Sequence, residues 1–132
     1  TPRLQFVCAN ALEYPLPESD AFILNDILHY MSYEHQRTLL LRCMERLRPE
    51  GKLIVRDGNA ANTRKHRLTR FTELLSTGIF SFNKTTEQLC FTSEAQIRNI
   101  AQEGGMQLEI LPNDRYTSNT IYIFQKNKPE HE

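Results

Sequence analysis

The chain has 132 residues, with 16 Lys and Arg against 16 Asp and Glu, so its formal net charge is zero. This length suits one domain with a single hydrophobic core. A composition of 39% hydrophobic and 24% charged residues is typical of a globular protein. No apolar run approaches the length of a membrane span, and the zero net charge argues against a nucleic-acid partner.

The sequence holds three cysteines, Cys8, Cys43 and Cys90, whose odd number and wide spacing argue against a disulfide framework or a metal site. We expect buried thiols in a reducing compartment. The N-terminus lacks a signal-peptide pattern, so the predicted location is the cytoplasm. Because the chain begins Thr1-Pro2, without an initiator Met, we expect it to be part of a longer protein.

Strand and helix patterns alternate in the first part of the chain. A short strand is predicted over 3–9, and the unbroken apolar run 21–24 is typical of a strand buried on both faces of a parallel sheet. Ser32 is the expected N-cap of an amphipathic helix over 33–48. A proline-glycine turn ends this helix, and a buried strand over 52–56 follows.

The second part predicts a helix-rich segment and then a hairpin. Its expected elements are a polar helix over 59–76, a loop or short hairpin over 77–90, an amphipathic helix capped by Thr92 or Ser93 and ended by Gly104-Gly105, an antiparallel hairpin of 106–111 with 119–125, and a polar tail over 127–132. This order of elements favours an α/β fold.

Polar residues follow each of the three strands predicted in the first part of the chain. They are Asn10 after the first strand, Asn25, Asp26 and His29 after the second, and Arg56 and Asp57 after the third. In open α/β sheets, ligands bind beyond the carboxyl ends of the strands. The sequence therefore predicts a ligand site at this edge.

These segments resemble the later half of the class I S-adenosylmethionine-dependent methyltransferases. The resemblance rests on Asn10-Ala11, on the run from Leu24 to Tyr30, and on the run from Leu47 to Asp57 with its Leu-x-Pro-x-Gly turn. The closing hairpin is similar to the family's last, antiparallel strand pair. The resemblance implies a Rossmann-like sheet with strand order 3-2-1-4-5-7-6, and S-adenosylmethionine as the cofactor.

The family's first strand, its glycine-rich loop and the acidic residue that holds the ribose do not occur in this sequence. We therefore expect residues 1–126 to form a methyltransferase sheet truncated at its N-terminal half, and the chain to be inactive by itself. Loss of the family's first two strands would expose the edge of 21–24. We expect Leu4 to Cys8 either to occupy that edge or to pair with a second copy of the chain in a homodimer.

The resemblance also implies roles for individual residues. His29 is a candidate general base, because imidazole titrates near neutral pH, and Asp57 is a candidate catalytic residue that would orient an acceptor hydroxyl or an anionic group. The expected cofactor contacts are Asn10, Ala11, Leu12, Asn25, Asp26, Ile27 and His29, and the expected acceptor contacts are Tyr30, Arg56, Arg64 and Tyr116. Each also has a structural alternative: a strand-end turn for Asn10, a packing role for His29, and a solvated helix face for Arg64.

The predicted activity is methyl transfer by direct displacement to a small-molecule or lipid-like acceptor. A looser similarity to the methyltransferase module of bacterial fusions with acyltransferase and exporter domains predicts tethering to the inner membrane through upstream domains. One alternative is a non-catalytic α/β module for interaction or assembly. Another is a nicotinamide-dependent reductase, although no residues here resemble a hydride-transfer site.

Overall fold

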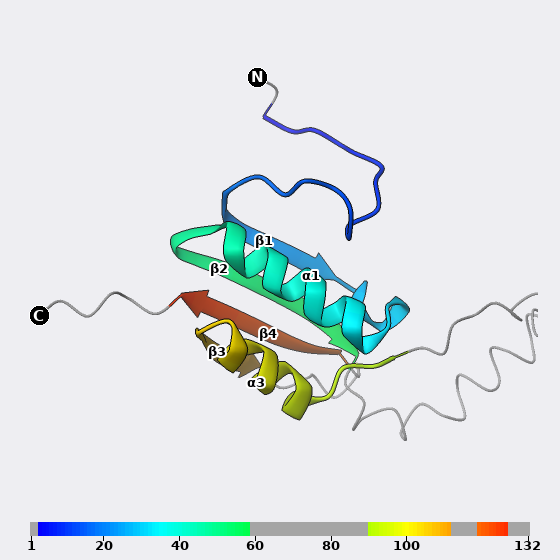
Figure 1. Cartoon of the computed structure of the whole chain (residues 1–132), viewed down its shortest axis with the longest axis vertical. Helices are drawn as coiled ribbons and strands as arrows, with labels where there is room; N and C mark the ends of the chain where they lie inside the picture. Colours follow the sequence, from blue (N-terminus) through cyan, green and yellow to red (C-terminus); the bar gives the residue numbers. More distant parts are fainter. Residues whose placement is uncertain (1–2, 59–89, 112–118, 127–132) are drawn as a thin grey trace, which may run out of the picture.

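The computed structural model describes residues 3–58, 90–111 and 119–126, which form a sheet with helices on one face (Figure 1). The sheet is four-stranded with the order β1-β2-β4-β3. Its strands are β1 (Ser19–Asn25), β2 (Leu47–Gly58), β3 (Met106–Leu111) and β4 (Asn119–Lys126). β1 runs parallel to β2, whereas β4 is antiparallel to both of its neighbours. The predicted α/β fold and closing hairpin are confirmed.

Helix α1 (Tyr33–Arg46) begins at its predicted cap, because the Ser32 side chain accepts a hydrogen bond of 3.2 Å from the His35 N–H. Its apolar stripe, including Leu39 and Leu40, is buried against the sheet. The predicted end at residue 48 is wrong, because β2 already begins at Leu47. The proline at position 49 disfavours helical backbone in the residue before it, which explains the earlier stop.

Helix α3 (Glu94–Glu103) is capped by Ser93, whose side chain accepts from the Gln96 N–H at 3.2 Å. Its buried face consists of Ile97, Ile100 and Ala101. The turn into β3 places Gly105 at a φ of 68°, a left-handed conformation that glycine adopts at little cost. The cap, buried face and glycine stop agree with the sequence prediction.

The core lies between the sheet and the two helices α1 and α3, which cover the same face (Figure 1). Leu53 and Val55 of β2, with Tyr122 and Phe124 of β4, are fully buried there. The prediction that the second strand is buried on both faces is wrong, since Ile23 is 69% exposed. Phe22 and Leu24 pack against the core, so Ile23 between them faces the other side of the sheet. No helix of the described residues covers that side (Figure 1).

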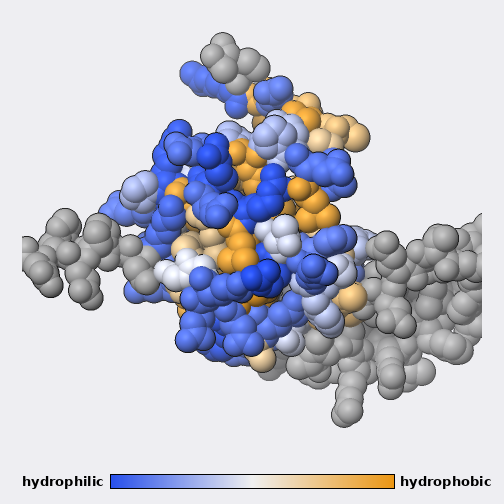
Figure 2. Space-filling view, in the orientation of Figure 1, coloured by the Kyte–Doolittle hydropathy of each residue, from blue (hydrophilic) through white to orange (hydrophobic). Residues whose placement is uncertain are grey.

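The strand predicted over 3–9 does not form. Phe6 is 88% exposed and Leu4 71% exposed, and Figure 2 shows apolar atoms on this N-terminal segment. β1 pairs with β2 and has no other strand beside it among the described residues, so the prediction that Leu4 to Cys8 occupy this edge is also wrong. Pairing with a second copy stays a prediction.

The linker between the N-terminal segment and β1, residues 10–18, is hydrogen-bonded to side chains of α1. Arg42 donates to the carbonyl oxygens of Ala11 and Leu12 at 2.9 and 2.6 Å, and Arg46 donates to that of Leu16 at 2.8 Å. These bonds tie the linker to α1. A strand needs a neighbour for its backbone groups, and this segment meets none within the described chain.

The remaining predictions divide into tested and untested ones. Burial of Cys43 is confirmed, whereas Cys8 is exposed because it lies on the unpaired segment. The helix predicted over 59–76, nearly all of the loop over 77–90, and the tail over 127–132 fall outside the described residues. Within the described part of the chain, no helix has the length and apolar character needed to cross a membrane.

Candidate functional site

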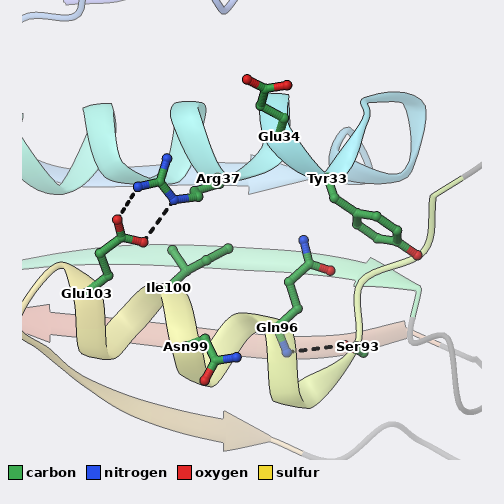
Figure 3. A pocket seen from close by; sticks show the side chains of 8 residues that line it. All are labelled: Tyr33, Glu34, Arg37, Ser93, Gln96, Asn99, Ile100 and Glu103. Carbon is green, nitrogen blue, oxygen red and sulfur yellow. Dashed lines mark hydrogen bonds and ion pairs between the residues drawn. The ribbon is translucent and has the colours of Figure 1, made fainter.

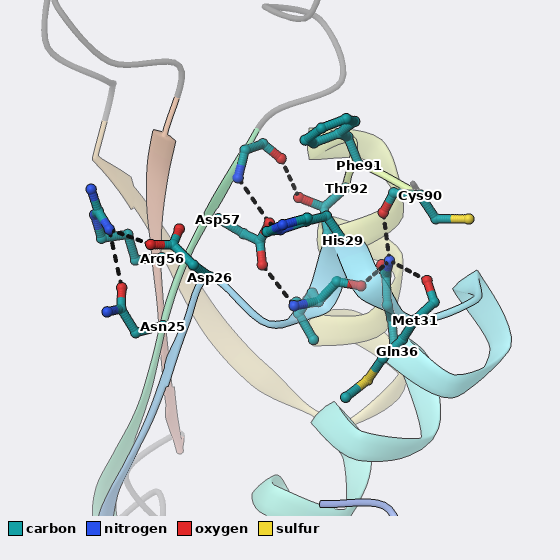
Figure 4. Close-up of polar contacts among 12 residues, drawn as sticks. Asn25, Asp26, His29, Met31, Gln36, Arg56, Asp57, Cys90, Phe91 and Thr92 are labelled. Carbon is teal, nitrogen blue, oxygen red and sulfur yellow. Dashed lines mark hydrogen bonds and ion pairs between the residues drawn. The ribbon is translucent and has the colours of Figure 1, made fainter. Parts of the chain in front are cut away.

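The ends of β1 and β2 bring His29 and Asp57 together (Figure 4). Asp57 is the penultimate residue of β2, and His29 lies on the short 3-10 helix η1 (Leu28–Tyr30) that follows β1. The Nδ1 atom of His29 is 2.7 Å from Oδ1 of Asp57. Because β1 and β2 are parallel neighbours, their carboxyl ends meet at one edge of the sheet, as the sequence predicts.

The Asp57 carboxylate is fully buried and accepts hydrogen bonds from three sides. The Leu28 N–H donates to Oδ2 at 2.8 Å, and the Gly58 N–H donates to Oδ1 at 2.9 Å. A carboxylate only accepts, so its bond to His29 requires the proton on Nδ1. In the neutral imidazole Nε2 then carries the lone pair, and the His29 side chain is 15% exposed.

Two aromatic rings flank the His29 imidazole. The ring of Phe91 is stacked on it, with centroids 5.5 Å apart and an interplanar angle of 10°. The ring of Tyr30 is tilted by 41° with its centroid 4.0 Å away, and this side chain is 65% exposed. Tyr30, an acceptor candidate from the sequence, therefore lies beside the candidate base together with Phe91.

Gln36, which the sequence analysis missed, lies fully buried behind η1 (Figure 4). Its side-chain amide donates to the carbonyl oxygens of Leu28, Met31 and Cys90. A signal was present in the sequence, because Gln36 is a polar residue on the same helical stripe as Leu40 and Cys43. A polar side chain on the buried stripe of a helix indicates a specific hydrogen-bonding role.

Arg56, Asn25 and Asp26 form a second polar group at the same edge (Figure 4). The Arg56 Nη1 atom donates to Oδ2 of Asp26 at 2.7 Å and to Oδ1 of Asn25 at 3.2 Å. Asp26 has a φ of 56°, an uncommon left-handed backbone for a residue other than glycine. The structure thus brings these candidates together with each other, while His29 pairs with Asp57.

Asn10 closes a tight turn of its own. Its Oδ1 atom accepts from the Leu12 N–H at 2.9 Å, and its carbonyl oxygen accepts from the Tyr14 N–H at 2.8 Å. This is the turn that the sequence left open as an alternative, although no strand precedes it among the described residues, and the amide oxygen has a second lone pair. Ala11, Leu12 and Ile27 are half-buried and pack against the core.

Two predicted acceptor residues, Arg64 and Tyr116, lie outside the described residues. Among the residues that are described, no group of three or more His, Cys, Asp or Glu side chains is arranged to hold a metal ion.

A groove of about 710 Å³ separates α1 from α3 (Figure 3). Tyr33, Gln96 and Ile100 line it, and Arg37 and Glu103 pair across it through two hydrogen bonds. This pairing raises the pKa of Arg37 and lowers the pKa of Glu103. His29 and Asp57 do not line the groove, so it is separate from the site at the strand ends.

Comparisons with known proteins identify the family from a domain profile and the fold from solved structures. The profile of the O-methyltransferase domain matches residues 1–107. An O-methyltransferase family protein from Burkholderia thailandensis is 20% identical with a TM-score of 0.64, covering 97% of this chain. Human N-acetylserotonin methyltransferase, solved with SAM, is 18% identical with a TM-score of 0.63, covering 91%. At these identities the similarity shows a shared fold.

The match covers only part of these relatives. The chain spans 37% of the Burkholderia protein and 33% of the human enzyme. It spans 45% of the magnesium protoporphyrin IX methyltransferase from Synechocystis PCC 6803, which was solved with SAM and is 13% identical with a TM-score of 0.61. No curated protein matches the chain.

Proposed function

Because the chain belongs to the O-methyltransferase domain family, we propose that its His29–Asp57 pair deprotonates an acceptor hydroxyl during methyl transfer from S-adenosylmethionine. The observation that carries this proposal is the bond of 2.7 Å between Asp57 Oδ1 and His29 Nδ1. This bond fixes the tautomer in which Nε2 is free to accept a proton.

The chain's own residues handle the proton. His29 Nε2 takes it from the acceptor oxygen, and the resulting imidazolium is stabilised by the buried Asp57 carboxylate. S-adenosylmethionine, when bound, supplies a methyl group on a sulfonium: the new O–CH₃ bond forms as the S–CH₃ bond breaks, and the electron pair leaves with sulfur. Positioning contributes most of the rate in such a displacement, with the base adding to it.

The described residues fit one side of the cofactor. The second lone pair of Asn10 Oδ1 is available to the adenine amino group, and we propose that Asn25 to Ile27, at the end of β1, contact the ribose and methionine. The glycine-rich loop expected of the family is not in this sequence. We therefore propose that the 132-residue chain binds S-adenosylmethionine more weakly than micromolar by itself.

The surroundings of His29 support a planar acceptor, in the small-molecule or lipid-like class. Phe91 stacks on the imidazole, and the exposed Tyr30 ring has its centroid 4.0 Å from that of the imidazole. Aromatic rings pack well against flat, apolar substrates. A phenol would present its hydroxyl to His29 while its ring contacts Tyr30.

Isotope transfer tests the proposal. The longest polypeptide that the gene encodes is incubated with S-adenosylmethionine carrying a deuterated methyl group and a panel of phenols, alcohols, amines and thiols. Mass spectrometry should find the label on oxygen, with phenols preferred. Label found only on nitrogen or sulfur would contradict O-methyl transfer.

A non-catalytic assembly module is the second candidate, and the open side of β1 favours it. β1 has a strand on one side only within the described chain, and unpaired strand edges recruit other strands. If no acceptor takes the label and the polypeptide elutes as a stable dimer through this edge, the assembly function stands in place of catalysis.

A further inference from the structure

Gln36 is a fully buried polar side chain in the first turns of α1. Its Nε2 atom lies 2.8 Å from the Leu28 carbonyl oxygen, 3.1 Å from that of Met31 and 2.6 Å from that of Cys90. Its Oε1 atom accepts from the Gln96 side chain at 3.4 Å. Four contacts to four separate residues therefore converge on one amide.

Packing alone does not explain this residue. The neighbouring positions on the stripe, Leu39, Leu40 and Cys43, are apolar, and an apolar side chain at position 36 would avoid the cost of burying an amide. The two N–H bonds of the amide are shared among three backbone oxygens, of which that of Leu28 belongs to a fully buried residue and those of Met31 and Cys90 to half-buried ones. Removing the amide would leave these oxygens with fewer donors, which is costly in a buried place.

The three carbonyl groups belong to the two walls around His29. Leu28 and Met31 bracket the turn that carries His29, and Cys90 begins a segment, Cys90 to Thr92, that we call the strap. The strap is held against the turn by a further bond of 3.0 Å, from the Cys90 N–H to the His29 carbonyl oxygen. It also carries Phe91, whose ring stacks on the imidazole.

The far end of the strap is fastened to β2. The Thr92 hydroxyl donates to the Gly58 carbonyl oxygen at 3.2 Å, and Gly58 in turn donates to Asp57. Tyr33, the first residue of α1, donates to the Phe91 carbonyl oxygen at 3.2 Å. Gln36 thus joins α1, the His29 turn and the strap through a single side chain.

We infer that Gln36 is a positioning residue for His29: its amide locks the His29 turn to the strap and so holds the imidazole between Asp57 and Phe91. The inference rests on the proposed function for the role of His29 as the base. The hydrogen bonds that hold His29 can be measured without any substrate. The Nδ1–H proton of His29 reports on it directly, because its bond to Asp57 protects it from exchange with water.

Nitrogen-15 NMR of the 132-residue chain provides the test. In the unsubstituted chain, His29 should show one tautomer with a proton on Nδ1 that exchanges slowly. Gln36→Met keeps the side-chain volume and removes the amide, so exchange of this proton should become about tenfold faster or more. Gln36→Glu keeps the shape but turns a carboxylate toward three carbonyl oxygens, and it should loosen the site at least as much.

Gln102→Met is the matched control, because Gln102 is an exposed residue of α3 and the chemical change is the same. Its exchange rate at His29 should equal that of the unsubstituted chain. The inference is overturned if Gln36→Met retains both the fold and the slow exchange of the Nδ1 proton.

A measurement on the unsubstituted chain decides the matter if the Gln36 variants do not fold. The exchange rate of the Cys90 N–H with deuterium should be within about tenfold of that of the Leu40 N–H in the middle of α1. The reason is that Gln36 holds the strap in place, so that the Cys90 N–H stays bonded to the His29 carbonyl oxygen. Exchange of Cys90 as fast as in an unfolded chain would overturn the inference. Neither measurement depends on methyl transfer, so failure of this inference can be distinguished from failure of the proposed function.

Discussion

Two segments of similar sequence, residues 21–24 of β1 and residues 4–8 near the N-terminus, differ in structure. Both are short and mostly apolar, and both lead to an asparagine. The first run pairs with β2 along its length, and the turn beyond it is fixed by buried hydrogen bonds to Asp57 and Gln36. The second run stays unpaired, with Phe6 88% exposed.

The difference shows that an apolar run becomes a strand only where another backbone accepts it. β1 has β2 beside it because the intervening helix α1 packs back onto the sheet and returns the chain in parallel. Residues 4–8 have no such neighbour in the described chain, and Arg42 holds the linker after them on α1. The two regions therefore differ in whether their backbone N–H and C=O groups find hydrogen-bond partners, more than in hydrophobicity.

Asp57→Ala should break the ordered region most severely. The substitution leaves the N–H groups of Leu28 and Gly58 and the Nδ1–H of His29 without their acceptor in a buried place. We expect the free energy of unfolding to fall by about 3 kcal/mol or more, measured by urea denaturation. Asp20→Ala is the control, since Asp20 is exposed, and it should change stability by less than about 0.5 kcal/mol. Equal effects of the two substitutions would contradict the role given to Asp57.

Thiol labelling should separate the two regions by rate. Cys8 lies on the exposed segment, whereas burial raises the pKa of the Cys43 thiol to about 11. The thiolate is the reactive form, and the two units above its ordinary value of 9.0 leave about 100-fold less of it near neutral pH. Mass-resolved alkylation at pH 8 should therefore label Cys8 about 100-fold faster than Cys43, and the rates should converge in denaturant. Comparable rates in the folded chain would contradict the burial of Cys43.

Gly58→Ala should disturb the contact between the strap and His29. A Cβ atom at this position would lie 2.9 Å from Cδ1 of Phe91, closer than side chains pack. We expect a loss of about 1–3 kcal/mol in the free energy of unfolding, with a change in the His29 ring resonances. Adding Phe91→Leu should relieve part of that loss, because the smaller side chain leaves room for the methyl group. A purely additive double variant would show that the ring is not what the methyl group meets.

Phe6→Ser should have the smallest effect. Because Phe6 is 88% exposed and its segment pairs with no described strand, the free energy of unfolding should change by less than about 0.5 kcal/mol. A loss of more than about 1 kcal/mol would mean that the segment is docked on another surface in solution, and sedimentation would then show whether a second copy supplies it.

Features set by local chemistry could be predicted from the sequence. Ser32 and Ser93 are the caps expected from the residue preferences of helix N-termini, and Gly105 adopts the left-handed backbone that ends α3. The meeting of His29 with Asp57 also follows from the rule that parallel strands deliver their ends to one edge. These features depend on few residues or on a general rule of topology.

Features set by distant partners could not be predicted in the same way. Adjacent residues of a strand point to opposite faces, so Arg56 and Asp57 must diverge, but the sequence alone did not say which of them faces the helices. The structure places Asp57 under His29 and turns Arg56 toward Asp26. The side-chain N–H groups of Gln36 donate to three backbone oxygens, which leave no trace in side-chain patterns.

The central claim is that His29, held by Asp57, is the base of an O-methyltransferase site. The most direct test compares methyl transfer to a phenol by the longest encoded polypeptide and by its His29→Ala variant, with His35→Ala as the control because His35 is exposed on α1. We predict that kcat falls by about 100-fold or more in His29→Ala and is unchanged in His35→Ala, with cofactor affinity preserved in both. An undiminished kcat in His29→Ala would contradict the account.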